Sequence, residues 1–285
     1  MLVDFHTHTT ASDGALSPAD LVQRALARGV SQLAITDHDT VAGYRAAAAS
    51  RALATGDLHL VPGVELSCQW SGVNVHVVGL NLDVDHPVLA AGLSRQAEAR
   101  LERAAVIARR LEKLGLPGAL EGARAAAGDS QIGRPHFAAW MVAQGHVAEP
   151  SVAFDRYLGR GKPGDVKAFW PVLEEVVGWI VAAGGVAVLA HPLKYRLTRT
   201  RLERLTADFR AAGGGAVEVL SGRQLPNEGR ELRELARRQQ LAVSLGSDFH
   251  QEQSWAADLG VEPRHLEGLR GVWERWQAPE QESCT

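Results

Sequence analysis

Apolar runs without a helical period recur along the chain and alternate with segments whose apolar residues repeat every three to four positions. The first run, residues 2–5, predicts a buried strand that begins almost at the first residue. Similar runs predict strands at residues 33–35, 58–66, 73–78, 186–190, 216–220 and 241–245. Helical patterns separate most of these strands. This alternation predicts an α/β fold with a parallel sheet that closes as a barrel.

Helix boundaries support this interpretation. Ser17 is typical of an N-cap, Pro18 of a first helical position, and Gly29 of a residue beyond a helix end. These signals predict a helix over residues 17–29. Further helical patterns between the strands lie at residues 41–54, 173–183, 202–212 and 228–239.

The pattern changes after residue 83. One long helical segment covers residues 88–114, and shorter ones follow at 119–127, 135–144 and 151–158. No strand pattern is evident in this region. The sequence therefore predicts a barrel formed by residues 1–83 and 166–285, with a small helical insertion, 84–165, that caps the active site.

The composition of the 285 residues is that of an ordinary globular protein, with 46% hydrophobic and 22% charged residues. A net charge of −3 provides no overall basic field for long nucleic acids, so phosphate recognition must be local. Cys68 and Cys284 are too few for a disulfide framework and suit a reducing compartment. With no secretory signal pattern and no apolar run long enough for a membrane span, we expect a cytoplasmic protein without a membrane partner.

Histidines and carboxylates gather at or near the ends of the predicted strands. His6 and His8 are two residues apart on a strand and therefore project from the same face. In an α/β barrel, functional residues collect where strands end at the carboxyl face. A capping carboxylate or a hydrogen-bonded histidine would explain each residue alone, but not the set. We predict that these residues bind metal: His6, His8, Asp13, His38, Glu65, His76, His191, Asp248 and His250.

Imidazole and carboxylate groups without thiolate suit Zn, Mn or Fe. Nine potential ligands exceed what one ion uses, whereas two or three ions that share a bridging carboxylate would account for them. Clustered divalent ions lower the pKa of a bridging water and neutralise charge on a phosphoryl group. The residues therefore predict metal-assisted phosphate-ester hydrolysis by attack of a metal-activated hydroxide.

Several short motifs resemble those of the PHP (polymerase and histidinol phosphatase) family. They are His6-Thr7-His8-Thr9, Ser12-Asp13-Gly14, Thr36-Asp37-His38-Asp39, Pro62-Gly63-Val64-Glu65, His76, Ala190-His191-Pro192 and Gly246-Ser247-Asp248-Phe249-His250. The resemblance covers residues 1–80 and 186–255 and implies a distorted (β/α)7 barrel that holds a trinuclear metal centre. It also implies two or three divalent ions, with Mn expected and Zn, Fe or Mg as alternatives.

The same resemblance implies how the ligands divide among the ions. His6, His8, Glu65 and Asp248 would hold one ion. Glu65 would bridge to a second ion, held also by His76 and His191. The third ion would be bound by Asp13, His38 and His250.

Ser12-Asp13-Gly14-Ala15-Leu16-Ser17-Pro18 together with the helical insertion resembles a stand-alone branch of this family. That branch removes the 3′-phosphate of 3′,5′-nucleoside bisphosphates such as pAp, and some members also trim short 5′-phosphorylated RNAs in the 5′-to-3′ direction. A histidinol-phosphate phosphatase is a further alternative. A non-catalytic metal-binding module is disfavoured because no ligand position is lost. The expected partner is a small nucleotide or a short RNA, with no stable protein partner implied.

A substrate with two phosphates requires a second anion site away from the metals. Arg95, Arg100 and Arg103 on the long predicted helix are candidates, although the acidic residues among them would also suit a solvated, salt-bridged face. Arg134, at a predicted helix start where backbone amides favour anions, is a stronger candidate. His136 could bind substrate or cap the helix, and Lys194 could reach a phosphate or face water. For the proton that the leaving oxygen needs, Asp13 and His191 are candidate donors.

Overall fold

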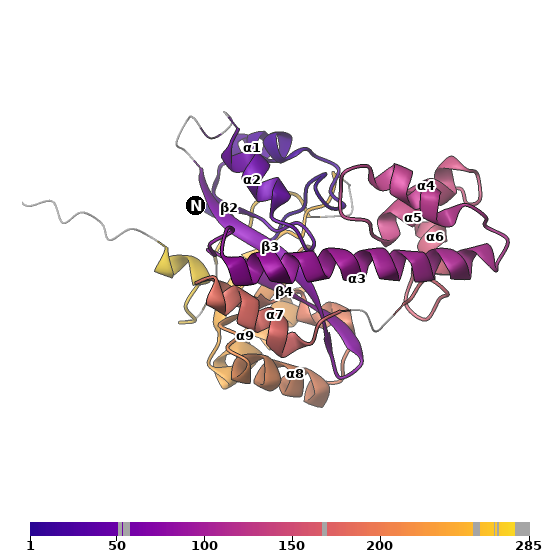
Figure 1. Ribbon diagram of the computed structural model, residues 1–285. Coiled ribbons are helices and arrows are strands. Elements are labelled where there is room, and N and C mark those ends of the chain that lie inside the picture. The colour runs from indigo at the N-terminus through magenta and orange to yellow at the C-terminus, as the bar shows by residue number, and fades with distance from the viewer. Residues whose placement is uncertain are drawn as a thin grey trace, which may run out of the picture.

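A seven-stranded sheet forms the centre of the protein in the computed structural model. The structure, shown in Figure 1, describes residues 1–50, 53, 58–166, 170–252, 257–264, 266 and 268–276. Cys284 and the last residues of the helix predicted at 41–54 lie outside the described residues. The strands follow the sequence in order across the sheet. They are β1 (Leu2–Asp4), β2 (Val30–Ile35), β3 (His59–Trp70), β4 (Val73–Leu80), β5 (Val186–Leu189), β6 (Ala216–Ser221) and β7 (Ala242–Gly246).

The sheet is mixed, which corrects the prediction of a wholly parallel one. β4 runs antiparallel to both β3 and β5, whereas the other neighbouring pairs are parallel. The reason lies in the two-residue turn between β3 and β4. Ser71 and Gly72 adopt φ angles of 45° and 75°, and two central residues with positive φ make the tight hairpin turn that only antiparallel strands can share.

The two edges of the sheet approach each other. The amide of Phe5 donates to the carbonyl of Leu245 at 3.0 Å, and the amide of Asp248 donates to the carbonyl of His6 at 2.9 Å. These bonds bring the end of β1 beside the end of β7. The sheet is therefore a nearly closed barrel, and the predicted α/β barrel fold is confirmed.

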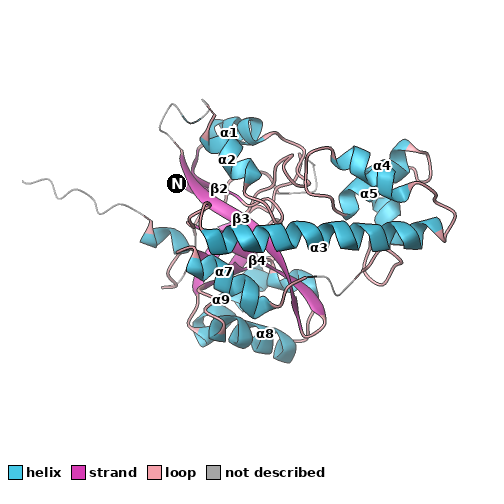
Figure 2. Ribbon diagram, viewed as in Figure 1, coloured by secondary structure: helices cyan, strands magenta, loops and turns pink. Residues whose placement is uncertain are grey.

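Helices cover the outside of this barrel (Figure 2). The Ser17 hydroxyl caps the first helix by accepting from the amide of Asp20 at 3.2 Å, which confirms the sequence signal. Apolar faces of the helices pack against the strands, and Leu21, Val177 and Leu232 are fully buried there. The helices of this layer are α1 (Pro18–Ala27), α2 (Ala42–Ala48), α7 (Leu173–Ala182), α8 (Arg199–Ala211) and α9 (Pro226–Gln239). Short 3-10 turns lie at η3 (Pro192–Tyr195) and η4 (Val272–Arg275).

A second group of helices lies between β4 and β5 in the sequence. Its longest member, α3 (Pro87–Glu112), extends from the barrel to the lobe formed by the others (Figure 1). This lobe has a hydrophobic cluster of its own, in which Ile107, Phe137 and Met141 are buried. The other helices are α4 (Ala119–Ala127), α5 (Arg134–Ala143), α6 (Pro150–Ala153) and the π-helical turn η2 (Phe154–Leu158). Within the described part of the chain, every helix is too short or too polar to span a bilayer.

Candidate metal centre

His6 and His8 follow β1 and point toward two carboxylates, one on β3 and one in the loop after β7. Both residues are fully buried. His6 Nε2 lies 3.2 Å and His8 Nε2 3.3 Å from Glu65 Oε2. The same two nitrogens lie 3.6 and 3.5 Å from Asp248 Oδ1, in the loop after β7. Four side chains from three segments therefore meet at one point.

Glu65 has a second face toward two further histidines. Its Oε1 lies 2.8 Å from His76 Nδ1 and 2.9 Å from His191 Nε2. Contrary to the strand-end pattern seen in the sequence, Glu65 and His76 lie within β3 and β4. They meet because the antiparallel register pairs Glu65 with Val78, which places His76 diagonally opposite on the same face.

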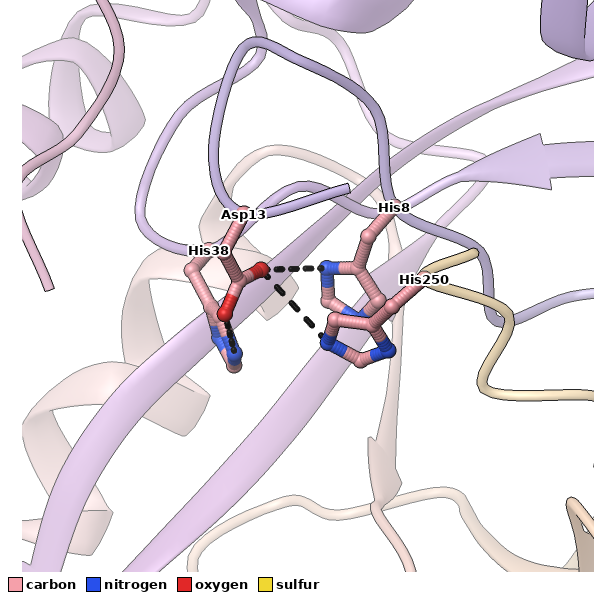
Figure 3. A group of neighbouring side chains, drawn as sticks. All are labelled: His8, Asp13, His38 and His250. Carbon is pink, nitrogen blue, oxygen red and sulfur yellow. Dashed lines mark ion pairs between the residues drawn. The ribbon is translucent and has the colours of Figure 1, made fainter. Parts of the chain in front are cut away.

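A third group surrounds Asp13, in the loop after β1. Its carboxylate lies 3.8 Å from His8 Nδ1, 3.9 Å from His38 Nε2 and 3.5 Å from His250 Nε2 (Figure 3). His38 also approaches Glu65, with 2.9 Å between Nδ1 and Oε2. The carboxylates of Glu65 and Asp13 thus link the three groups into one cluster. The structure brings together all nine residues selected from the sequence.

The donor atoms of this cluster suit metal ions. They form four overlapping groups, within each of which the ligand atoms lie within 4.8 Å of one another. His6 Nε2, both ring nitrogens of His8, and Glu65 Oε2 are buried without a hydrogen-bond partner. Buried polar atoms are costly unless they are paired. Divalent cations would satisfy them together, so these residues fit the predicted ions; their role as ligands stays a prediction.

Burial and neighbouring charges set the protonation states of the cluster. Burial lowers the pKa of His38, but Glu65 and Asp13 outweigh it and raise that pKa to about 9. Glu218 and Glu65 likewise outweigh burial and raise the pKa of His6 well above its usual range. Metal binding would displace the protons from those two rings.

Burial and the neighbouring His250 lower the pKa of His8 to about 3. Burial also lowers the pKa of His76 to about 4, so that both rings are neutral at pH 7. Burial alone would raise the pKa of Glu65, but His38, His76 and His6 outweigh it and hold that pKa well below the usual range. Neutral imidazole and charged carboxylate are the forms that bind metal.

Glu218, on β6, lies beneath the cluster and was missed by the sequence analysis. Its Oε1 lies 2.9 Å from His6 Nδ1, and its Oε2 accepts the backbone amide of His191 at 2.6 Å. A carboxylate that orients a ligand histidine is common around metals. No sequence signal marked Glu218, because it lies inside an apolar strand rather than in a motif.

A buried acid next to His38, Asp37, holds two loops together. The Asp37 carboxylate accepts hydrogen bonds from the Thr9 amide at 2.7 Å and the Ser12 hydroxyl at 2.6 Å, which ties the loop after β1 to the loop after β2.

Two residues of the cluster have unusual backbone angles: His191 and Asp248 adopt φ angles of 26° and 53°. Positive φ is uncommon for residues other than glycine and collects at functional sites, where surrounding contacts enforce it.

A cavity of about 160 Å³ adjoins the cluster. Asp13, His38 and His76 form part of its wall, and the helical region contributes three guanidinium groups, those of Arg100, Arg103 and Arg134. Phe154 and Trp170 also line it. The cavity therefore places positive charge and aromatic faces directly beside the candidate metal centre. We refer to it below as the arginine pocket.

The three arginines are engaged to different degrees. Arg100 binds the Asp39 carboxylate through Nε at 2.7 Å and Nη2 at 2.6 Å, and its Nη1 donates to a backbone carbonyl. Arg103 donates through Nε to the Val166 carbonyl at 3.3 Å. Arg134 donates through Nη1 to the Leu158 carbonyl at 3.1 Å. Arg103 and Arg134 therefore keep more donors for a ligand than Arg100 does.

The remaining sequence candidates lie elsewhere. Arg95 is exposed and pairs with Glu175 on the surface, 2.9 Å away. His136 acts as a helix cap, because its Nδ1 accepts the Gly133 amide at 2.9 Å and its Nε2 lies 3.3 Å from Ser130 Oγ. Lys194 contacts the Asp248 carboxylate from outside the arginine pocket.

Comparisons with known proteins show which family the chain resembles. Residues 4–111 match the family model of the PHP domain. A 5′-3′ exoribonuclease, Rnm, of Escherichia coli (strain K12) is 44% identical over 98% of this chain and 95% of its own length. A 3′,5′-nucleoside bisphosphate phosphatase of Chromobacterium violaceum is 43% identical over 97% of this chain and 96% of its own length.

Two solved structures are similar to this chain over nearly its whole length. One is an amidohydrolase from Chromobacterium violaceum with bound sulfate and no metal, with a TM-score of 0.85 and 42% identity over 96% of this chain and 95% of that one. Another, from Bifidobacterium adolescentis, is assigned as a metal-dependent phosphoesterase and has a TM-score of 0.77 and 30% identity over 95% of this chain and 92% of that one. Relatives this similar over nearly the whole chain establish that the protein belongs to the PHP-domain family.

Proposed function

We propose that this protein is a metal-dependent phosphomonoesterase that removes the 3′-phosphate of 3′,5′-nucleoside bisphosphates. The arginine pocket carries this proposal. A cluster of metal ligands alone would suit any phosphate ester. A second anion site in the adjoining wall, formed by Arg100, Arg103 and Arg134, suits a substrate with two phosphates. The 3′-phosphate would lie at the cluster and the 5′-phosphate against the guanidinium groups.

The nine clustered residues would hold two or three divalent ions. His6, His8 and Asp248 form one candidate group, and Glu65 lies between this group and the pairs His38–His76 and His6–His191. Ions held there would lower the pKa of a shared water and neutralise charge on the phosphoryl oxygens. Within a trinuclear centre of this kind we propose Mn²⁺, because nitrogen and oxygen donors without thiolate suit it.

The protein's own groups supply orientation and a proton. Binding the 5′-phosphate away from the reacting bond converts binding energy into alignment of the 3′-phosphate. The departing 3′-oxygen needs a proton, and Asp13 and His191 are the proposed donors. Asp13 lies nearer the arginine pocket, because its carboxyl group lines it while His191 Nε2 is bonded to Glu65. His38 and His250 outweigh burial and hold the pKa of Asp13 below its usual range, so Asp13 would act only by relaying a proton from a neighbouring group.

The charges of the alternative substrates, histidinol phosphate and short RNA, distinguish how well each suits the arginine pocket. Histidinol phosphate carries one phosphate and a cationic amine, and three guanidinium groups beside the cluster would repel that amine. A short 5′-phosphorylated RNA carries the same terminal phosphate as a bisphosphate. The similarity to the exoribonuclease of Escherichia coli supports this second candidate. Both substrates use the same anion site.

We also propose that residues 84–165 cap the active site and that the protein is cytoplasmic. Support for the cap is that α3, α5 and η2 supply Arg100, Arg103, Arg134 and Phe154 to the wall of the arginine pocket. Support for the location is the buried free thiol of Cys68, which suits a reducing compartment.

Phosphate release from pAp, AMP, histidinol phosphate and p-nitrophenyl phosphate tests the proposal. With Mn²⁺ present, pAp should be hydrolysed with the highest kcat/KM. The variant Arg103→Met should lose at least about tenfold in kcat/KM for pAp, the effect of one charged hydrogen bond, and much less for p-nitrophenyl phosphate. Arg109→Met, on the exposed face of α3, is the matched control. Equal losses on both substrates would reject the role of the arginine pocket, and faster turnover of AMP would reject the assignment of the scissile phosphate.

A further inference from the structure

A second cavity, of about 220 Å³, lies beside the arginine pocket. Asn74, Arg134, Arg160 and Lys194 line it. Asn74 and Arg134 belong to both cavities, so the two share a wall. We call this cavity the lysine groove.

The lysine groove adjoins the metal cluster through one of its lining residues, Lys194. Lys194 Nζ contacts the Asp248 carboxylate, whereas the arginine pocket borders the cluster through Asp13, His38 and His76. The two cavities therefore border one reacting centre through different residues. A phosphate bound at the cluster could carry a substituent into each.

The lining of the lysine groove suits a phosphate chain. Arg134, Arg160 and Lys194 face one carboxylate among the described lining residues, that of Asp165, which also accepts the Gly161 amide at 2.8 Å. At the wall shared with the arginine pocket, the Asn74 side-chain oxygen is buried without a hydrogen-bond partner. An amide in that position can bond a sugar hydroxyl between two phosphates.

We propose that the lysine groove binds the nucleotide on the 3′ side of the cleaved bond when the substrate is a 5′-phosphorylated oligonucleotide. This inference rests on the proposed function, and for its oligonucleotide candidate it names the residues that would recognise the next nucleotide. A bisphosphate would fill the arginine pocket and leave the groove empty. An oligonucleotide would fill both.

The same bond breaks with either substrate. A water oxygen bonds to phosphorus, the bond from phosphorus to the 3′-oxygen breaks, and that oxygen takes a proton. From pAp the products are AMP and inorganic phosphate. From an oligonucleotide they are a nucleoside 5′-monophosphate and a strand one residue shorter that keeps the attacked phosphate at its 5′ end. That new terminal phosphate again fits the arginine pocket, so the strand can be shortened stepwise.

The test compares pAp with the 5′-phosphorylated dinucleotide pApA and the trinucleotide pApApA, using full-length protein with Mn²⁺. The readout is the ratio of kcat/KM for pApApA to that for pAp, because pApApA, unlike pApA, carries a further phosphate beyond the attacked one. Arg160→Ala should lower this ratio about tenfold, the effect of losing one charged hydrogen bond to a phosphate. The trinucleotide should show a steeper salt dependence than pAp, and Arg160→Ala should reduce that difference by about 0.7 in the logarithmic slope. Arg156→Ala, an exposed change on the preceding turn η2, is the matched control.

An unchanged ratio in Arg160→Ala would overturn the groove assignment, as would hydrolysis of pAp with no turnover of pApA. Both outcomes leave the proposed phosphatase activity standing. Failure to hydrolyse either substrate with any divalent metal would instead reject the proposed function itself.

Discussion

Replacing Glu218 by glutamine should weaken metal binding, although Glu218 itself is not among the predicted ligands. The side chain is 2% exposed, and its two oxygens serve His6 Nδ1 at 2.9 Å and the His191 amide at 2.6 Å. Glutamine has nearly the same shape but one acceptor oxygen. One of the two donors must therefore face an amide NH₂ group, and a ligand histidine loses its fixed orientation.

The magnitude follows from these contacts. A buried donor left without an acceptor costs about 1–3 kcal/mol in unfolding free energy. Loss of a carboxylate that orients a ligand typically weakens metal affinity by about 10- to 100-fold. We therefore expect Glu218→Gln to melt several degrees lower and to bind Mn²⁺ at least about tenfold more weakly.

Isothermal titration of the metal-free protein with Mn²⁺ at fixed pH measures the affinity, and differential scanning calorimetry measures the stability. Glu234→Gln, an exposed change on α9, should alter neither quantity. A Glu218→Gln variant that melts lower yet binds Mn²⁺ as tightly as wild type would show support for the fold alone. That result would refute the positioning role.

Three further predictions concern the barrel and the pocket. Burial and the neighbouring Arg134 and Arg100 lower the pKa of Arg103 to about 9. Arg103→Met should therefore relieve charge repulsion, leave Tm unchanged or higher, and reduce the stabilisation of the protein by added sulfate. A clear fall in Tm would contradict this prediction. Gly246→Ala should cost about 1–3 kcal/mol in unfolding free energy and weaken Mn²⁺ binding, because the added Cβ would lie 2.3 Å from His6 Cβ. The control in calorimetry is Gly178→Ala, whose added Cβ would meet no atom within 4 Å. Chelation of metal-loaded protein should lower Tm by several degrees in proportion to the bound metal, and an unchanged melting curve would argue against ions in the cluster.

Hydrophobic periodicity was sufficient for most of the fold. Strands and helices alternate as the apolar pattern predicts, and Ser17 caps its helix as expected. The direction of β4 was missed, because a period of two says nothing about strand direction. The information lay in Ser71 and Gly72, a turn too short for any crossover between parallel strands.

The site residues likewise divide into those that the sequence predicts and those that only the structure reveals. The nine clustered residues could be predicted because short motifs at strand ends mark most of them. Glu218 could not, since one acid in an apolar strand has no local signature and its partners His6 and His191 are distant in sequence. The arginines were selected by their charge and by their places on predicted helices. Arg100 and Arg103 face the pocket, but Arg95 on the same helix pairs with Glu175, and only tertiary packing separates these cases.

The central claim, that histidines and carboxylates from distant segments form one multinuclear metal centre, is tested most directly by metal content. Protein reconstituted with Mn²⁺ and freed of excess metal should contain two to three ions per chain by mass spectrometry. Glu65→Ala, which removes the carboxylate shared by two of the four candidate groups, should retain fewer than one ion. Less than one ion in wild type, or equal content in the variant, would contradict the account.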